Sequence, residues 1–221
     1  MKIALKIFLI SILALQCKSI EENNKLEKDW TETQKSRKYF DYARFIQKHP
    51  KSEHFEKALS KYFFFRDSVT GFSGCGKYNT SISVLDDEKI LFDQELKNID
   101  SLRYLTYQYL KNGIPNISTH KYVVKIPESK MWDSISKGHF DIVIYNNPFP
   151  VKSLKLVLGE ISIGISYYKK HLSEKWFDLP YNELTNGKKN GIDELNDTRF
   201  SFFDFSSMKD KTIKPQVPPE F

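Results

Sequence analysis

The feature that most constrains the fold is a long apolar stripe in the C-terminal half of the chain. Between Val151 and Phe177, apolar residues recur at alternating spacings of four and three, as on one face of an α-helix. The stripe consists of Leu154, Leu158, Ile161, Ile165, Tyr168, Leu172 and Trp176. Such a helix would span ~40 Å at about 1.5 Å per residue. Because a small domain cannot cover that length, its C-terminal half must pack on helices nearer the N-terminus, on the C-terminal tail or on a partner. Gly159 and Gly164 either weaken this helix or let another element approach it closely.

Strand patterns ahead of this helix predict an α+β fold. Residues 140–145 give the clearest strand, and residues 82–85 and 90–92, joined by an acidic turn, predict a β-hairpin. Asp100 can cap a further helix that ends near Gly113. We therefore expect a small mixed β-sheet with the long helix packed against it.

Two other segments are expected to add to this domain. Residues 114–138 contain two prolines and the strand-like run 122–124, which indicates an inserted loop with a little sheet. The aromatic run 200–205 predicts a strand or a segment that docks on the domain. The proline-rich tail 214–219 is expected to be extended.

The N-terminal part of the chain predicts two helices. The first runs from about Trp30 to Lys48, where His49 and Pro50 end it. Ser52 can cap the second, whose apolar positions have helical spacing. They are Phe55, Ala58, Leu59, Tyr62 and Phe63. Residues 45–58 resemble one tetratricopeptide-like helical hairpin, which cannot form a solenoid alone and should pack on the more C-terminal part of the chain.

The first 17 residues have the pattern of an export signal. Lys2 and Lys6 precede the apolar run 7–15, which is far shorter than the ~20 residues that span a bilayer. The run followed by Cys17 resembles the lipobox of bacterial lipoproteins, which implies a diacyl lipid on Cys17 as the first mature residue. Gln16 stands where the lipobox has a small residue, so a plain signal peptide and an uncleaved anchor remain alternatives.

Composition and charge exclude disorder and nucleic-acid binding. The chain is 40% hydrophobic and 28% charged, which is typical of globular proteins. Removal of residues 1–16 lowers the formal charge from +6 to +4, and no segment gathers this charge into a basic stripe. The second cysteine, Cys75, has no intramolecular partner if Cys17 carries lipid; otherwise a Cys17–Cys75 disulfide is the alternative.

The order of elements over residues 79–177 resembles the periplasmic domain of the ExbD/TolR family. Residues 166–185 carry the specific similarity: a long helix ends in a segment like the Phe-Gly-x-x-Tyr-x-Glu-Leu-Thr pattern of Bacteroidetes-type ExbD proteins. The corresponding residues are Phe177, Asp178, Tyr181, Glu183, Leu184 and Thr185. The resemblance implies a binding module that dimerises and pairs peptide segments along sheet edges. The family's membrane carboxylate is missing from the apolar run 7–15, so a proton relay is not expected.

A few groups of residues are candidates for sites of chemistry. His171 and Glu174 have the i, i+3 spacing of two metal ligands on one helical face, although no second such pair exists. Residues 71–77 match a phosphate-binding loop up to its lysine, but Tyr78 replaces the Mg²⁺-binding Ser or Thr. Cys75 within this loop could act as a nucleophile but lacks a family signature. His139 and Asp141 alternate along a strand and could share one face, whereas His49 and His54 are expected to diverge.

These patterns predict a non-catalytic envelope lipoprotein, without cofactors, that binds other proteins. We expect it on the periplasmic side of a bacterial membrane, the outer membrane in particular, and a homodimer is one oligomeric state open to it. It would be accessory to an energised transport system of the ExbB/ExbD/TonB or Tol type. A metal-assisted or thiol-dependent envelope enzyme and a purely structural lipoprotein are the alternatives.

The expected domain organisation has five parts. They are a signal peptide (1–16), a flexible tether (17–29), a helical hairpin with a glycine-rich linker (30–78), the ExbD/TolR-like domain (79–185) and a C-terminal extension with a proline-rich tail (186–221).

Overall fold

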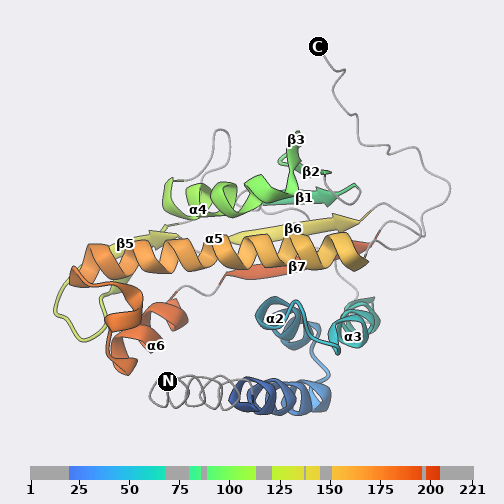
Figure 1. Cartoon of the computed structure of the whole chain (residues 1–221), viewed down its shortest axis with the longest axis horizontal. Helices are drawn as coiled ribbons and strands as arrows, with labels where there is room; N and C mark the ends of the chain where they lie inside the picture. Colours follow the sequence, from blue (N-terminus) through green and yellow to red (C-terminus); the bar gives the residue numbers. More distant parts are fainter. Residues whose placement is uncertain are drawn as a thin grey trace, which may run out of the picture. The chain divides into compact units, whose positions relative to one another are not determined.

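The computed structural model confirms the α+β class and divides the chain into two compact units, residues 1–70 and 71–221 (Figure 1). The residues that it describes are 20–67, 80–85, 89–112, 121–136, 138–144, 151–195 and 198–204. Cys17, Cys75, the loop 71–77, the turn 86–88 and the tail 214–219 lie outside these ranges. None of the helices in the described ranges is both long and apolar enough to cross a membrane.

The helical unit consists of helical residues 20–35, α2 (Tyr39–Lys48) and α3 (Phe55–Asp67). Its core is built from Trp30, Tyr42, Ala43, Phe45, Ile46, Phe55, Ala58, Leu59 and Tyr62. The helix α2 ends at Lys48, as His49 and Pro50 predicted. Ser52 accepts a hydrogen bond from the His54 amide at 3.0 Å in the turn before α3. The apolar spacing of both helices therefore identified the residues that pack.

Two expectations for this unit are wrong. Residues 20–29, expected as part of a flexible tether, are helical, and the helix expected over 30–48 is interrupted at residues 36–38. Trp30 accounts for the ordered helix, because its ring is buried, lies 5.0 Å from that of Phe45 and stacks at 4.8 Å on that of His54. One buried aromatic residue thus anchors a segment whose other side chains are mostly polar.

The second unit is built on a five-stranded mixed sheet with the strand order β3-β2-β1-β6-β7. The strands β1 (Thr80–Val84), β6 (His139–Ile144) and β7 (Arg199–Asp204) are parallel. The strands β2 (Lys89–Phe92) and β3 (Glu95–Asn98) continue the sheet in antiparallel pairs. The predicted hairpin is confirmed, and the strands expected at 140–145 and in the aromatic run 200–205 are confirmed up to residues 144 and 204, where the described ranges end.

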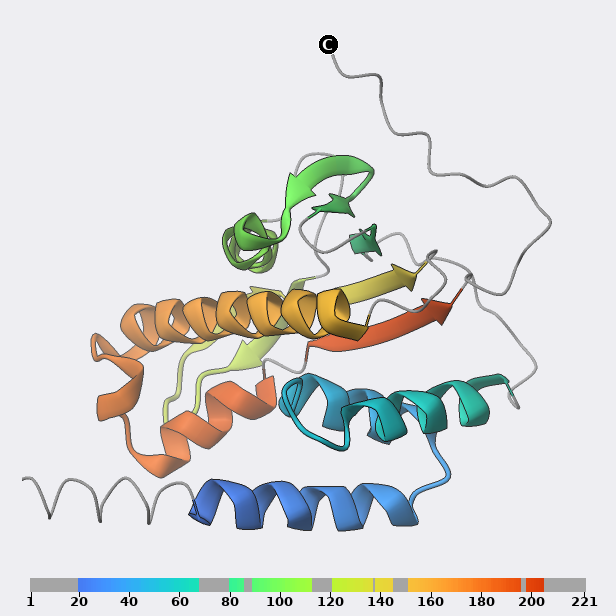
Figure 2. The same cartoon turned by 45° about the vertical axis from the view of Figure 1, so that its right-hand side comes forward.

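Two helices cover one face of this sheet (Figures 1 and 2). The short 3₁₀ helix η1 (Ile99–Ser101), which includes Asp100, leads into α4 (Leu102–Asn112), and α4 packs beside α5 (Val151–Phe177). All seven residues of the predicted apolar stripe of α5 are buried. The helix is therefore predicted correctly in its bounds and in its buried face.

A second, two-stranded antiparallel sheet covers the C-terminal half of α5. It is the β-hairpin β4 (Lys121–Lys125) and β5 (Trp132–Ser136), within the predicted insertion. The Tyr168 hydroxyl accepts a hydrogen bond from the Ser136 amide at 3.2 Å, and the Trp176 indole donates one to Asp133 at 2.6 Å. The chain thus supplies its own cover for the far half of α5.

The domain boundary expected at residue 185 is wrong, because the unit continues through α6 and β7. After η2 (Tyr181–Glu183), α6 (Asn186–Leu195) packs on the turn between β4 and β5. A β-carbon at Gly187 would overlap the Glu128 carboxylate, and one at Gly191 would overlap the ring of Pro127. Two glycines four residues apart let the turn lie directly on the helix backbone.

The two glycines of α5 lie in opposite environments. An added β-carbon at Gly164 would lie 2.5 Å from the carbonyl oxygen of Arg103 and 2.6 Å from the β-carbon of Thr106, both in α4. At Gly159 it would meet no atom within 4 Å. The close approach of α4 therefore explains why residue 164 is a glycine, but it does not explain the glycine at 159.

The helices α4 and α5 are also joined by Arg103 and Glu160, whose Nη2 and Oε1 atoms lie 2.8 Å apart.

We predict that Gly164→Ala destabilises the protein by about 1–3 kcal/mol, because the added methyl group forces α4 away from α5. Gly159→Ala should instead stabilise it by roughly 0.8–1 kcal/mol, the difference in helix propensity. Urea unfolding midpoints measure both changes. Similar stabilisation by the two substitutions would contradict the close approach at Gly164.

Candidate functional site

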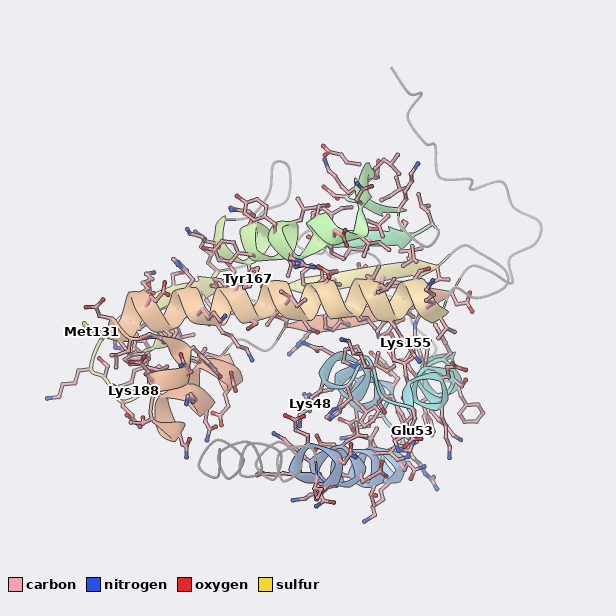
Figure 3. All side chains as sticks on the ribbon, in the orientation of Figure 1. Lys48, Glu53, Met131, Lys155, Tyr167 and Lys188 are labelled. Atoms are coloured by element: carbon pink, nitrogen blue, oxygen red, sulfur yellow. The ribbon has the colours of Figure 1, made fainter. Side chains whose placement is uncertain are left out.

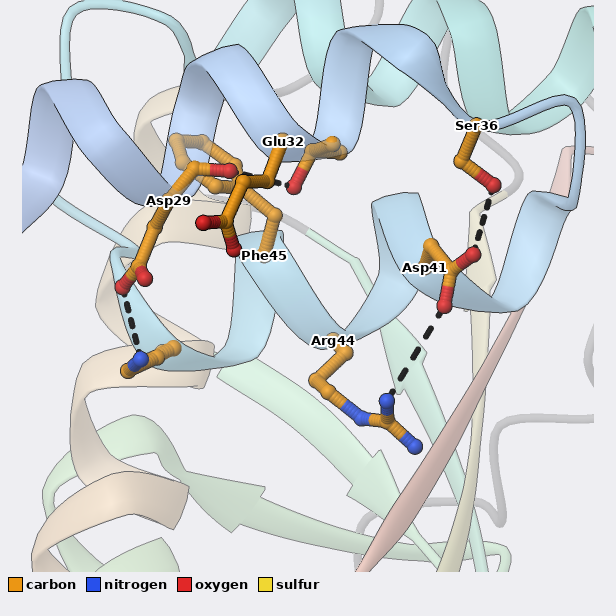
Figure 4. A pocket seen from close by; sticks show the side chains of 8 residues that line it. Asp29, Glu32, Ser36, Asp41, Arg44 and Phe45 are labelled. Carbon is orange, nitrogen blue, oxygen red and sulfur yellow. Dashed lines mark hydrogen bonds and ion pairs between the residues drawn. The ribbon is translucent and has the colours of Figure 1, made fainter.

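A groove of about 310 Å³ lies on the helical unit between residues 20–35 and α2 (Figure 4). Its walls are rich in charged and polar side chains. The lining residues are Asp29, Glu32, Thr33, Ser36, Asp41, Arg44, Phe45 and Lys48. The groove therefore favours a polar or charged ligand over an apolar one.

Most of the charges in this groove are already paired. Lys48 Nζ lies 2.6 Å and His49 Nε2 lies 2.8 Å from the same oxygen of Asp29. Ser36 donates a hydrogen bond of 2.5 Å to Asp41, whose other oxygen lies 3.9 Å from the Arg44 guanidinium. The contacts of Asp29 hold the helix of residues 20–35 to Lys48 of α2 and to His49, whereas Asp41 and Arg44 pair within α2.

Glu32 is the exception among the acidic residues of the groove. Its exposed side chain projects toward the groove in Figure 4, and it forms no hydrogen bond or ion pair with any described residue. The carboxylate is therefore available to a cationic group of a ligand.

The ion pairs of Asp29 affect the stability of the helical unit. Burial raises the pKa of Asp29, but the hydrogen bonds and positive charges of Lys48 and His49 outweigh it and hold the pKa below the ordinary value. A carboxyl whose pKa is lowered by folding stabilises the fold above its unfolded pKa, and this contribution disappears as the pH falls through the folded value.

We predict that Asp29→Asn lowers the free energy of unfolding by about 1 kcal/mol at neutral pH. The difference from the wild type should begin to shrink below about pH 4, the ordinary pKa of an aspartate, and disappear as the pH falls through the lower pKa of folded Asp29. Denaturant unfolding across this pH range measures it. Glu32→Gln serves as the control, because Glu32 has no ion pair with a described residue to lose, and a pH-independent effect of Asp29→Asn would contradict the role of the charge.

The nearest arrangement of metal-ligand residues lies on another part of the same unit. Ligand atoms of Glu27, Glu53 and His54 all lie within 4.8 Å of one another, and no other such group of three occurs in the described ranges. His54 Nε2 already contacts Glu27 at 2.9 Å, and its ring stacks on Trp30. His49 and His54 thus contact different carboxylates of residues 20–35, those of Asp29 and Glu27. The packing of His54 on Trp30 and Glu27 explains why Glu27, Glu53 and His54 lie close together without a metal ion.

Serine, histidine and aspartate meet on β6 and β7, but their geometry does not form a catalytic triad. His139 and Asp141 share a face, as their alternation suggested: His139 Nε2 lies 3.5 Å from Asp141 and 2.8 Å from the Ser201 hydroxyl. A triad requires the carboxylate and the hydroxyl at opposite ring nitrogens. Burial lowers the pKa of His139, Asp141 raises it and Arg199 lowers it. The net decrease favours a neutral imidazole near pH 7.

His171 and Glu174 do not acquire a third metal ligand from the described part of the chain. The His171 ring lies 6.2 Å from that of Tyr107 and 6.4 Å from that of Tyr168. Burial lowers the pKa of His171, and the neighbouring charges of Lys111 and Lys175 lower it further. The surroundings are those of a histidine packed among tyrosines.

The segment after α5 that carries the ExbD resemblance has a defined turn. Asp178, at the position of the glycine in the family pattern, has a φ of 51°, in the left-handed region that glycine adopts most easily. Leu184 is buried, and the Tyr181 hydroxyl donates a 2.6 Å hydrogen bond to Asp193 of α6. Burial and the Asp193 carboxylate raise the pKa of Tyr181. Three of the pattern's positions therefore serve to turn the chain and hold α6.

We predict that Asp178→Gly leaves the stability unchanged or raises it by up to about 1 kcal/mol, because glycine adopts the left-handed conformation without strain. Asp178→Val should lower it by roughly 1–2 kcal/mol. Thermal unfolding in matched buffers measures both, with Asp178→Asn as a control that tolerates this conformation. A fully stable Asp178→Val protein would show that the turn is not required.

Sequence analysis did not predict the groove. One of its walls is the helix of residues 20–35, and the polar composition of residues 20–29 indicated a flexible tether instead of a helix. The i, i+3 spacing of Asp41 and Arg44 was the one sign in the sequence of a paired, charged helix surface there.

The chain matches no protein-family model, and comparison with curated proteins and with solved structures gives no significant match.

Proposed function

We propose that this chain is a non-catalytic envelope lipoprotein, anchored through Cys17, that binds a basic segment of a partner protein in the groove of its helical unit. The observation that carries the proposal is the position of Glu32: an exposed carboxylate, without a partner among the described residues, on the wall of a groove. A lysine or arginine of the partner would pair with Glu32 there.

The neighbouring pairs favour the same partner chemistry. Arg44 is 65% exposed and lies 3.9 Å from Asp41, so this ion pair is weak and an incoming guanidinium can compete for Asp41. Asp29, with both Lys48 and His49 close to one oxygen, is the better-satisfied carboxylate. The partner's charge therefore belongs between Glu32 and Asp41.

The wider setting of the proposal is an accessory role in an energised transport system of the ExbB/ExbD/TonB or Tol type. Asp178 supports it, since its left-handed backbone stands where the ExbD pattern has glycine. The apolar run before Cys17, without an acidic residue, supports a lipid anchor on the periplasmic side rather than a proton-conducting subunit.

The proposal is tested by cross-linking in cell envelopes followed by affinity capture. Glu32→Lys should reduce capture of the partner by about tenfold or more, because it places like charges opposite each other. Glu22→Lys makes the same charge change elsewhere in residues 20–35 and should leave capture unchanged. Cys17→Ala should release the chain from the membrane fraction.

Equal capture by the wild type and Glu32→Lys would contradict the groove as the binding site. Capture of cell-wall proteins alone would replace the transport role with a structural one.

A further inference from the structure

One face of the β4–β5 hairpin is exposed and combines lysines with large apolar side chains. The register pairs Lys125 with Trp132 and Val123 with Ser134, and the alternation along β4 adds Lys121. We call these five residues the hairpin face. Val123 is 73% exposed and Trp132 is 66% exposed. Met131, in the same hairpin and labelled in Figure 3, is 60% exposed.

The opposite face of the hairpin is used in packing on α5. Ile135 is 1% exposed, and Asp133 holds both the Trp176 indole and the Lys175 ammonium, each at 2.6 Å. The outward orientation of Val123 and Trp132 is therefore fixed by the contacts on the other side of the same ribbon. No rearrangement is needed to present them.

The hairpin face is positively charged. Lys121, Lys125 and, in the turn, Lys130 form no ion pair with any described residue. The two carboxylates of the hairpin are directed elsewhere: Asp133 toward α5, and Glu128 toward Gly187 and Thr185 beside α6. The lysines therefore surround Val123 and Trp132 without a neutralising acid among them.

We propose that the hairpin face docks on the surface of an anionic lipid bilayer. Tryptophan is enriched at membrane interfaces, where its ring lies at the headgroup level. Lysine side chains can lie along the apolar boundary while their ammonium groups reach lipid phosphates. The exposed Val123 and Trp132 match the apolar layer of the bilayer surface. The lysines around them, which no described acid neutralises, match the layer of lipid phosphates. This contact is separate from the groove and from the lipid on Cys17.

The docking holds the second unit against the bilayer. A lipid anchor alone fixes one end of the chain and leaves the orientation of the folded part free. The hairpin face would select one orientation, with α5 bound to the ribbon from the side opposite the lipid.

Tryptophan fluorescence of the full chain, reconstituted with vesicles, tests the proposal. Trp30 and Trp176 are only 5% and 8% exposed, so quenching by aqueous iodide reports chiefly on Trp132. Vesicles of phosphatidylcholine alone are compared with vesicles that also contain phosphatidylglycerol in equal amount. On the anionic vesicles Trp132 should become protected from iodide and be quenched by brominated acyl chains.

The variant Lys121→Gln, Lys125→Gln, Lys130→Gln should shift the docking equilibrium by about 100-fold toward the undocked state and restore iodide quenching. A matched triple change at the exposed residues Lys51, Lys152 and Lys170 should leave the protection intact. Trp132→Phe should remove the signal and confirm its source. Glu32→Lys should dock like the wild type, which separates this proposal from binding in the groove.

Three outcomes would overturn the proposal. Trp132 could remain equally open to iodide on both kinds of vesicle. Protection could persist in the hairpin triple-glutamine variant. Protection could also arise only when envelope proteins are added, in which case the hairpin face is a protein interface.

Discussion

The apolar stripe of α5 has to be covered along its whole length, and the strands beneath it are too short to do so. A six-residue strand such as β6 extends about 20 Å, roughly half the length of the helix. The main sheet covers the N-terminal part, α4 packs along the middle of the helix from Glu160 to His171, and the β4–β5 hairpin and α6 cover the C-terminal part. The insertion between α4 and β6 is thus needed to bury the C-terminal part of the apolar stripe of α5.

The contacts that α5 makes with α4 and with the β4–β5 hairpin differ in kind. Toward α4 the helix relies on backbone approach at Gly164, reinforced by the paired Arg103 and Glu160. Toward the hairpin it relies on side chains with polar tips, Tyr168 and Trp176, which satisfy Ser136 and Asp133. Polar contacts of this kind specify the position of a small ribbon that has little core of its own.

Periodicity predicted the parts of the fold that bury a regular face, and failed where tertiary contacts stabilise a segment with weak local preference. The bounds of α5 and the pairing of β1 with β2 follow directly from apolar spacing. In β3 most residues are exposed, so no alternation marked it. In α6 two glycines argue against a helix, yet the turn that lies on them requires their small size. The groove depends on Trp30, a single anchor that no periodic pattern reveals.

The pairing of β7 with β6 also determines when the second unit can be completed. These strands are neighbours in space, but all of α5 and α6 lies between them in the chain. The helical unit needs only contacts among residues 20–67, so it can form early during synthesis. The parallel sheet has to wait until residues 199–204 have emerged, and β6 keeps one open edge until then. Truncation before residue 199 would therefore remove a strand that pairs with β6 in the sheet.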